Sequence, residues 1–240
     1  MRRCPTIKLR RVAVFAMFFL LIPSGLFAQT DFYSLSVRGS FTTSSKLFFN
    51  IGEPSEFLRN QYFALDDVLG IGLDVRRSFA ESRLQVGISV EYLGTSETFA
   101  AVVSSGTVPV VNGYWAVPIE LSGYFLIPFS TADLRLYIGG GLGIYLGERR
   151  HSVAGETAAI ISSTPGAGIH VTTGLEYSLT KWFALRSEVK FRDLQFESTH
   201  RFDKDFVVYN GRTVVLDKTP SRSRVNVDGM TLDAGIVVRF

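Results

Sequence analysis

The sequence has no long apolar run after residue 28, so nothing in that region predicts a membrane-spanning helix, which needs about 20 apolar residues. The shorter apolar run from Val12 to Ile22 follows a basic patch and is interrupted by Pro23. This is the layout of a secretory signal peptide. We expect cleavage after Ala28, which divides the chain into a signal peptide over residues 1–28 and one domain over residues 29–240.

Cysteine is almost absent, since Cys4 is the only one in the chain. It lies ahead of the apolar core of the expected signal peptide, so it is not placed as the acylated cysteine of a lipoprotein would be. The mature chain would then have no thiol at all. This excludes a disulfide framework and a cysteine-ligated metal site, and we expect no cofactor.

Basic residues are in excess only because of the leader. The signal segment holds five of the 25 lysines and arginines and none of the 22 acidic residues, which leaves a mature charge of about −2. The basic isoelectric point therefore belongs to the leader. Nucleic-acid binding would need a basic face on the mature domain, so we expect no nucleic-acid partner.

Residues 230–240 alternate strictly between apolar side chains and a mixed face, which is the period of a β-strand. The apolar face runs the whole length of the segment without a break. A soluble edge strand at a chain end would usually carry a charge or a proline there. The apolar residues are Met230, Leu232, Ala234, Ile236, Val238 and Phe240.

The pattern Asp233-x-Gly235-x-x-Val238-x-Phe240 resembles the C-terminal signal of bacterial outer-membrane β-barrels. In that family a polar residue, a glycine and two alternate hydrophobic residues, the last an aromatic, are read by the barrel-assembly machinery. The resemblance implies this role for the four residues. It also implies that the last strand pairs with the first.

Seven further segments show the same alternation and predict, with the last one, eight strands. Three short turns and four long connections join them in strict alternation, which is typical of bacterial transmembrane barrels. The predicted strands are 32–41, 69–76, 84–92, 114–125, 134–146, 169–178, 183–192 and 230–240. The predicted long connections are 42–66, 94–113, 148–166 and 194–226.

A lipocalin-like soluble barrel is the structural alternative, because it also has one apolar face per strand, but it turns that face inward. The terminal signature and the charge-free apolar faces favour lipid. We therefore predict an all-β protein, an eight-stranded antiparallel up-and-down transmembrane β-barrel. It resembles the small OmpA/OmpX-type barrels, which implies a location in the bacterial outer membrane and contact with outer-membrane lipid.

The inward faces of the predicted strands carry seven basic and six acidic residues. An eight-stranded barrel is just wide enough for side chains to fill it, and isolated buried charges are costly, so mutual pairing is expected. The alternative is a narrow polar pore gated by rearranging those pairs. The residues are Arg38, Asp74, Arg76, Glu91, Glu120, Arg135, Glu176, Arg186, Glu188, Lys190, Arg192, Asp233 and Arg239.

His170, Thr172 and Glu176 share one face of the sixth predicted strand and invite comparison with barrel-type lipid A deacylases. The match is poor, because threonine replaces the serine of that family and the face is assigned inward. We expect no catalytic residues. The glycines from Gly139 to Gly143 precede no helix, so they are expected to leave room for tyrosines in the lumen rather than to bind a phosphate.

Two features of the long connections predict recognition. The Asn210-Gly211 pair predicts a tight hairpin in a ribbon that projects above the surface, where it could pair with a partner's strand. Basic residues of the loops are candidates for lipid phosphates or lipopolysaccharide; they are Arg149, Arg150, Arg201, Arg222 and Arg224.

The predicted function is that of a non-enzymatic envelope protein with a packed polar interior. Its role is either structural or the recognition of partners at the cell surface through its long outer loops. A narrow porin-like channel for small solutes is the first alternative. A membrane enzyme acting on lipid is the second, and the sequence offers no convincing nucleophile and base for it.

Overall fold

A computed structural model describes residues 32–79, 83–103, 106–131 and 133–240. The predicted signal peptide and its cleavage site lie outside these residues. Within them the chain is almost entirely β-structure, and its one helix is the four-residue α2 (Glu56–Arg59), inside the predicted long connection 42–66. No helix of this part of the chain is long and apolar enough to cross a membrane.

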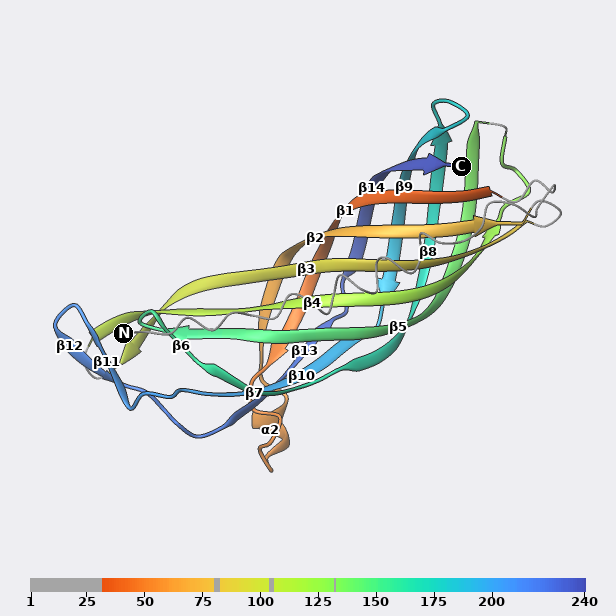
Figure 1. Cartoon of the computed structure of the whole chain (residues 1–240). Helices are drawn as coiled ribbons and strands as arrows, with labels where there is room; N and C mark the ends of the chain where they lie inside the picture. The colour runs from red at the N-terminus through yellow and green to blue at the C-terminus, as the bar shows by residue number, and fades with distance from the viewer. Residues whose placement is uncertain (1–31, 80–82, 104–105, 132) are drawn as a thin grey trace, which may run out of the picture. The chain divides into compact units, whose positions relative to one another are not determined.

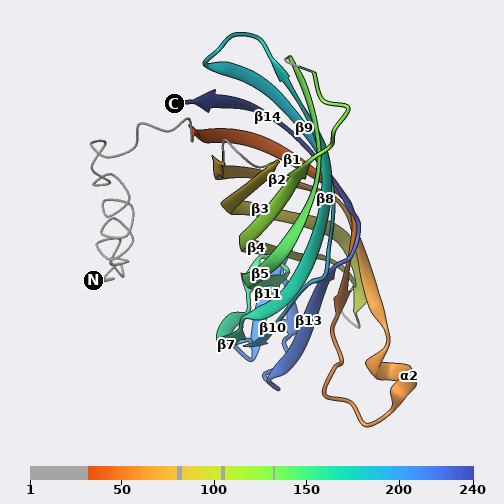
Figure 2. The ribbon, with the colours of Figure 1, turned by 90° about the vertical axis from the view of Figure 1, so that its right-hand side faces the viewer.

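Eight antiparallel strands form a closed ring (Figures 1 and 2). Each neighbour in the ring is the neighbour in the predicted order, and the last strand pairs with the first. The ring strands are β1 (Phe32–Phe48), β2 (Tyr62–Ser78), β3 (Leu84–Val103), β4 (Gly106–Leu126), β5 (Leu134–Val153), β8 (Gly166–Ser178), β9 (Phe183–Arg192) and β14 (Met230–Arg239).

The seam between β1 and β14 is a regular ladder over nine paired positions, from Ser34 opposite Arg239 to Thr42 opposite Thr231. Reciprocal backbone bonds of 2.9 Å between Tyr33 and Phe240 extend it to the end of the chain. The four predicted signal residues lie on this strand. A Cβ at Gly235 would come 2.4 Å from the carbonyl oxygen of Val37, so glycine lets β1 approach closely there.

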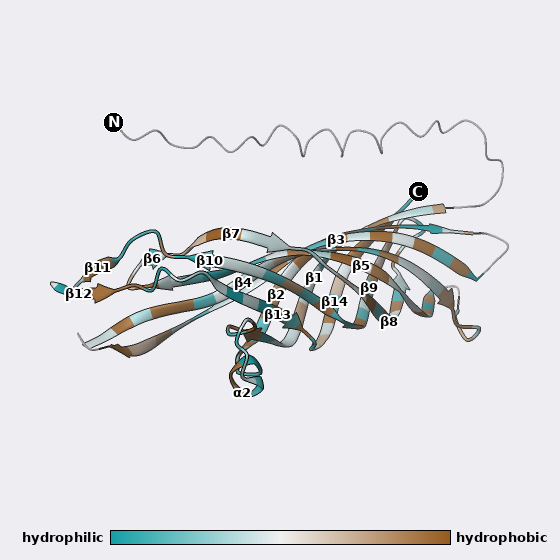
Figure 3. Ribbon diagram, turned by 90° about the horizontal axis from the view of Figure 1, so that it is seen from below, coloured by the Kyte–Doolittle hydropathy of each residue, from teal (hydrophilic) through white to brown (hydrophobic). Residues whose placement is uncertain are grey.

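The apolar face of each ring strand points outward, and the alternating bands of Figure 3 show how hydropathy changes from residue to residue along the strands. On β2, Leu69 is 66% exposed, whereas Arg76 is 1% exposed. A soluble barrel would have the opposite arrangement, so the lipocalin-like alternative is wrong. An apolar exterior around a closed ring is what lipid requires.

The strands extend further on the long-connection side than periodicity predicted. The β3–β4 ladder continues to Val103 opposite Gly106, so most of the predicted long connection 94–113 is itself paired strand. Residues 104 and 105, which join the two strands, lie outside the described part. Proline is accommodated within β4: the β3–β4 pairing passes from Val90–Ile119 to Leu93–Ala116 and so skips Pro118.

The long connections build a structured outer extension, by which we mean the described residues of 42–66, 94–113, 148–166 and 194–226. Its sheet continues the ring: β13 pairs with the end of β1 and with β10, and β10 pairs with β7. The further strands are β6 (Glu156–Thr157), β7 (Ala159–Thr164), β10 (Leu194–Arg201), β11 (Phe206–Tyr209), β12 (Arg212–Val215) and β13 (Ser221–Val227).

The predicted Asn-Gly hairpin is confirmed as β11–β12. Asn210 and Gly211 have φ of 50° and 75°, the positive values that a tight hairpin turn requires. The ribbon is docked by one face, because Val214 packs in an apolar cluster with Val108 and Val110 of β4. Figure 1 shows the hairpin beside the far ends of β3 and β4.

Candidate functional site: the barrel interior

The thirteen inward charges predicted from the sequence all belong to ring strands, and twelve of them are buried in the ring. The exception is Arg135, whose side chain is 25% exposed at the short-turn end. The structure places basic and acidic members of this set within ion-pair distance of one another. The network runs along the barrel in three groups, from the short turns towards the outer extension.

Glu176 is the centre of the first group. It accepts hydrogen bonds from Arg186 at 2.7 Å and from Arg239, and Arg135 lies 4.0 Å away. Arg186 also bonds to Asp74 at 2.5 Å, which links this group to the next. Three cations therefore share one carboxylate at the short-turn end.

Glu188 is the centre of the second group. Arg76 donates to it at 2.5 Å, the Tyr137 hydroxyl donates at 2.6 Å, and Arg38 lies at 3.5 Å. The guanidinium of Arg76 also lies 3.7 Å from the centre of the Tyr124 ring, a cation–π arrangement. These rings and charges fill the cross-section of the ring.

The third group lies nearest the outer extension. Lys190 donates to Glu120 at 2.7 Å, and Arg192 donates to both oxygens of Glu91 at 3.0 and 3.1 Å. Asp233 is held more loosely, with Arg38 at 3.8 Å and Lys190 at 4.0 Å. Removing one partner of a buried pair typically costs about 3–5 kcal/mol, so rearranging these groups to open a path is unfavourable.

Glycines make room for the aromatic side chains, as expected. A Cβ at Gly139 would lie 2.5 Å from the Tyr124 ring, and one at Gly174 would lie 2.6 Å from the Tyr137 ring. Gly143 has the same relation to Tyr145 at 2.8 Å. The glycines of the strands therefore leave the space that the tyrosine rings occupy in the lumen.

An apolar layer closes the interior on the side of the outer extension, and sequence reasoning missed it. It lies beyond the third charged group: Tyr114 precedes Glu120 on β4, and Phe196 of β10 follows Arg192, the last residue of β9. The interior is therefore not polar throughout. The layer comprises Leu47, Leu65, Val68, Leu93, Tyr114, Ala116, Tyr145, Leu194, Phe196, Val225 and Val227.

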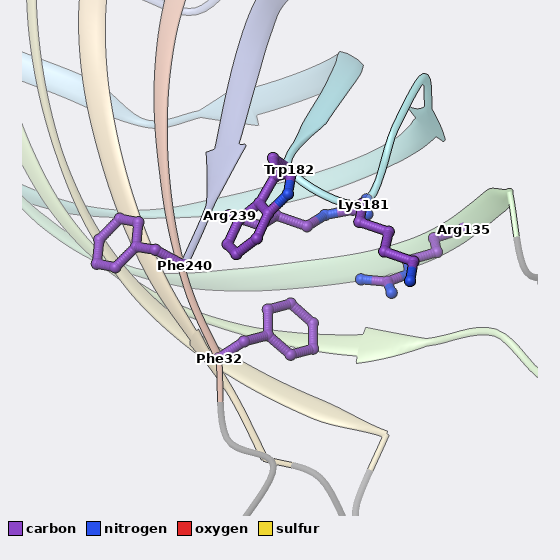
Figure 4. Close-up of a pocket in the computed structure, with 6 residues that line it drawn as sticks. All are labelled: Phe32, Arg135, Lys181, Trp182, Arg239 and Phe240. Atoms are coloured by element: carbon purple, nitrogen blue, oxygen red, sulfur yellow. The ribbon is translucent and has the colours of Figure 1, made fainter.

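The short-turn end has a shallow cavity of about 320 Å³, whose lining is drawn in Figure 4. Phe32, Trp182 and Phe240 form its apolar wall, and Arg135 and Arg239 line it as well. Since Arg239 is paired with Glu176, the first charged group forms the floor of this opening. The cavity belongs to the mouth of the barrel.

The residues compared with lipid A deacylases each bond to other partners. His170 Nε2 lies 2.8 Å from the buried Ser122 hydroxyl, Thr172 donates to the carbonyl oxygen of Val189, and Glu176 is bound by arginines. All three face inward as predicted. Among the described residues no group of three or more histidines and carboxylates is placed to hold a metal ion.

The basic loop residues are only partly placed as expected. Arg149 is buried inside the outer extension, so its expected contact with lipid phosphates is wrong. Arg222 and Arg224 both bond to Glu197, at 2.6 and 2.8 Å. Arg150 and Arg201 are exposed and stay candidates for anionic lipid.

No protein-family model and no curated protein sequence matches the chain. Among solved structures, the outer membrane protein OprG from Pseudomonas aeruginosa has a TM-score of 0.57 at 14% identity, over 88% of this chain and 95% of OprG. The chain has the fold of a small outer-membrane β-barrel. The predicted resemblance is therefore confirmed at the level of the fold, and the bacterial outer membrane is the location that this fold and the apolar exterior match.

Two further solved structures are less similar. Neisserial surface protein A gives a TM-score of 0.46 at 14% identity, over 87% of this chain and 97% of that chain. The attachment invasion locus protein Ail of Yersinia pestis gives 0.45 at 14% identity, over 88% of this chain and 100% of that chain. At such identities the likeness concerns the fold and carries no activity across.

Proposed function

We propose that this protein is a non-enzymatic outer-membrane barrel with a sealed interior, which holds its outer extension at the cell surface for recognition. The observation that carries the proposal is the filled lumen. Three groups of ion pairs are followed by an apolar layer, and every ring strand contributes to one or the other. Such a barrel serves as a rigid base.

The outer extension supports a recognition role because it is itself ordered sheet. Its strands pair with the ring and with one another, and two apolar clusters fix the β11–β12 hairpin on it. An ordered surface is pre-organised, which lowers the entropic cost of binding. The partners we propose are outer-membrane lipid around the ring, and a surface protein or lipopolysaccharide at the extension.

We also propose that the barrel-assembly machinery reads Asp233, Gly235, Val238 and Phe240. In the folded ring Asp233 faces the lumen while Val238 and Phe240 face outward. Phe240 stacks on Tyr33 of the first strand, with ring centres 6.3 Å apart. The residues of the expected signal thus also complete the seam.

The test of the sealed interior is conductance of the refolded protein in a planar bilayer. We expect no steady conductance from protein shown to be inserted by its resistance to added protease. As a control, Glu176→Gln and Arg186→Gln each alter the first charged group. Steady wild-type conductance that changes with either substitution would refute the proposal and make the narrow channel the primary function.

A further inference from the structure

The outer extension contains a partly open cavity of about 430 Å³, and none of the thirteen lumen charges lines it. Its polar lining includes Asn112, Arg149, His151 and His200, and its apolar lining includes Phe63 and Phe99. Ligand pockets for small molecules typically measure about 300–1,000 Å³ and combine an apolar wall with a few polar groups. This cavity has that size and that composition.

Arg149 is a buried cation without a counter-charge. It is 6% exposed, and among the described residues no carboxylate lies within ion-pair distance of it. Its guanidinium instead donates to the Asn112 side-chain oxygen at 2.8 Å and to His200 Nε2 at 3.1 Å. By contrast, all six buried cations of the lumen have carboxylate partners. An unpaired buried charge is energetically costly, so an anion bound next to Arg149 would be stabilised by it.

The unused hydrogen-bonding atoms around Arg149 are donors. Because His200 Nε2 accepts from Arg149, its proton is on Nδ1, and this buried Nδ1 has no partner. The Nε of Arg149 is also buried without a partner. Burial, and then the positive charge of Arg149, lower the pKa of His200 to about 3 and that of His151 to about 4, so both rings are neutral at pH 7.

The other charged groups of the lining do not neutralise the site. Arg201 and Asp217 are both exposed and carry opposite charges. Asp217 already accepts a 2.8 Å bond from the Thr219 backbone amide. Burial lowers the pKa of Arg149 to about 10, which leaves it charged at neutral pH. The cavity therefore has one uncompensated positive charge.

The aromatic wall limits the class of anion. The rings of Phe63 and Phe99 lie 5.4 Å apart, and Phe202, also in the lining, contacts His151 with ring centres 5.5 Å apart. An inorganic ion would leave these faces against water. A carboxylate on an aromatic or branched apolar body would satisfy both parts of the cavity, because a guanidinium matches a carboxylate with two parallel bonds.

We propose that this cavity binds a small organic carboxylate with an apolar body, its carboxylate on Arg149 and its body against the phenylalanines. This ligand class would specify what the proposed surface recognition binds. It rests on the proposed function in one respect only, which is that the outer extension lies outside the membrane. Ligand binding can be absent while the protein still shows no conductance in the planar bilayer. The binding test and the conductance test therefore distinguish failure of this proposal from failure of the sealed-barrel proposal.

The experiment is a titration of the full mature chain, refolded in detergent, with phenylacetate, followed by NMR chemical shifts. We expect saturable binding with a Kd of about 1 mM or tighter, and none with 2-phenylethanol, which keeps the ring and lacks the charge. Inorganic phosphate is expected to bind more weakly. The proposal is wrong if phenylacetate shows no saturation up to about 10 mM, or if the alcohol or phosphate binds equally well.

Matched variants assign the site. Arg149→Met should weaken phenylacetate binding at least about tenfold, whereas Arg150→Met, which removes the same charge from the adjacent exposed position, should not. Without ligand, Arg149→Met should melt at the same or a higher temperature, because it removes an unpaired buried charge. A lower melting temperature together with unchanged binding would make Arg149 a structural residue and overturn the proposal.

Discussion

His200 shows how a single buried residue links the outer extension to pH. It is buried, it accepts a hydrogen bond from Arg149, and His151 lies beside it with ring centres 6.4 Å apart. Protonation would remove that bond and place a second positive charge against the guanidinium. The neutral ring is therefore the folded form.

The free energy of unfolding should consequently decrease as the pH is lowered below about 6.5. The pKa of His200 is lowered to about 3 in the folded state, from an unfolded value of about 6.5, so the unfolded chain binds more protons between these values. Its contribution is complete above pH 6.5 and is lost as the pH falls towards 3. In detergent, by near-UV circular dichroism, the melting temperature should fall between pH 7 and 4 by at least about 3 °C more in wild type than in His200→Gln.

The His200→Gln variant serves as the reference because a glutamine oxygen can still accept from Arg149 and does not titrate. All other titrating groups are common to the two proteins. If the melting temperatures of both proteins fell equally over this pH range, protonation of His200 would not be a cause of the acid destabilisation, and the prediction would be wrong.

Single residues were predictable where their environment follows from strand alternation. The inward assignment of Glu188 or Arg192 required only a period of two, and both are in the lumen network. Arg149 could not be predicted in this way, because the predicted strand ends at residue 146 and leaves Arg149 in a loop. It belongs to β5, which continues to Val153, and at that point inward means towards the cavity.

At the scale of elements, the β11–β12 hairpin is fixed to the outer extension by one face. Val214 is 3% exposed and packs with Val108, Val110 and Ala154, whereas its neighbour Val215 is 82% exposed. Both are valines of β12, and they lie on opposite faces of the hairpin. They therefore form a matched pair for testing whether the hairpin is docked.

Val214→Asp should undock the hairpin, because a carboxylate buried among valines has no partner; we expect a loss of about 3 kcal/mol from the outer extension. Limited proteolysis should then cut within residues 194–226 while the ring stays intact on a gel. Val215→Asp should be cleaved as slowly as wild type. Equal rates for the two variants would mean that the hairpin is not docked on the outer extension.

Element positions were predictable in the ring and less so outside it. All eight ring strands were located, since lipid imposes a continuous apolar face on each. The strands of the outer extension, such as β10 and β13, lie in water on one side and against other loops on the other. Their pairing depends on contacts between residues distant in sequence, such as Phe196 with Val225, and short-range alternation does not reveal these.

At the scale of the whole molecule, closure of the ring is the feature on which the other properties of the barrel depend. Both the filled lumen and the apolar exterior follow only if β1 pairs with β14. In the ladder Val37 lies opposite Ile236, and both side chains face outward. Directly paired antiparallel residues have Cα atoms about 4.5–5.5 Å apart, which suits a disulfide.

The most direct measurement is disulfide formation across this seam in the chain from Gln29 onward, which contains no cysteine of its own. Refolded Val37→Cys/Ile236→Cys should oxidise to a cross-linked species with altered gel mobility. Val37→Cys/Leu232→Cys should not, because Leu232 pairs with Phe41, four positions and about 13 Å along the strand. Cross-linking in the first protein alone would confirm the closed ring in this register, whereas its absence there, or equal cross-linking in both, would contradict it.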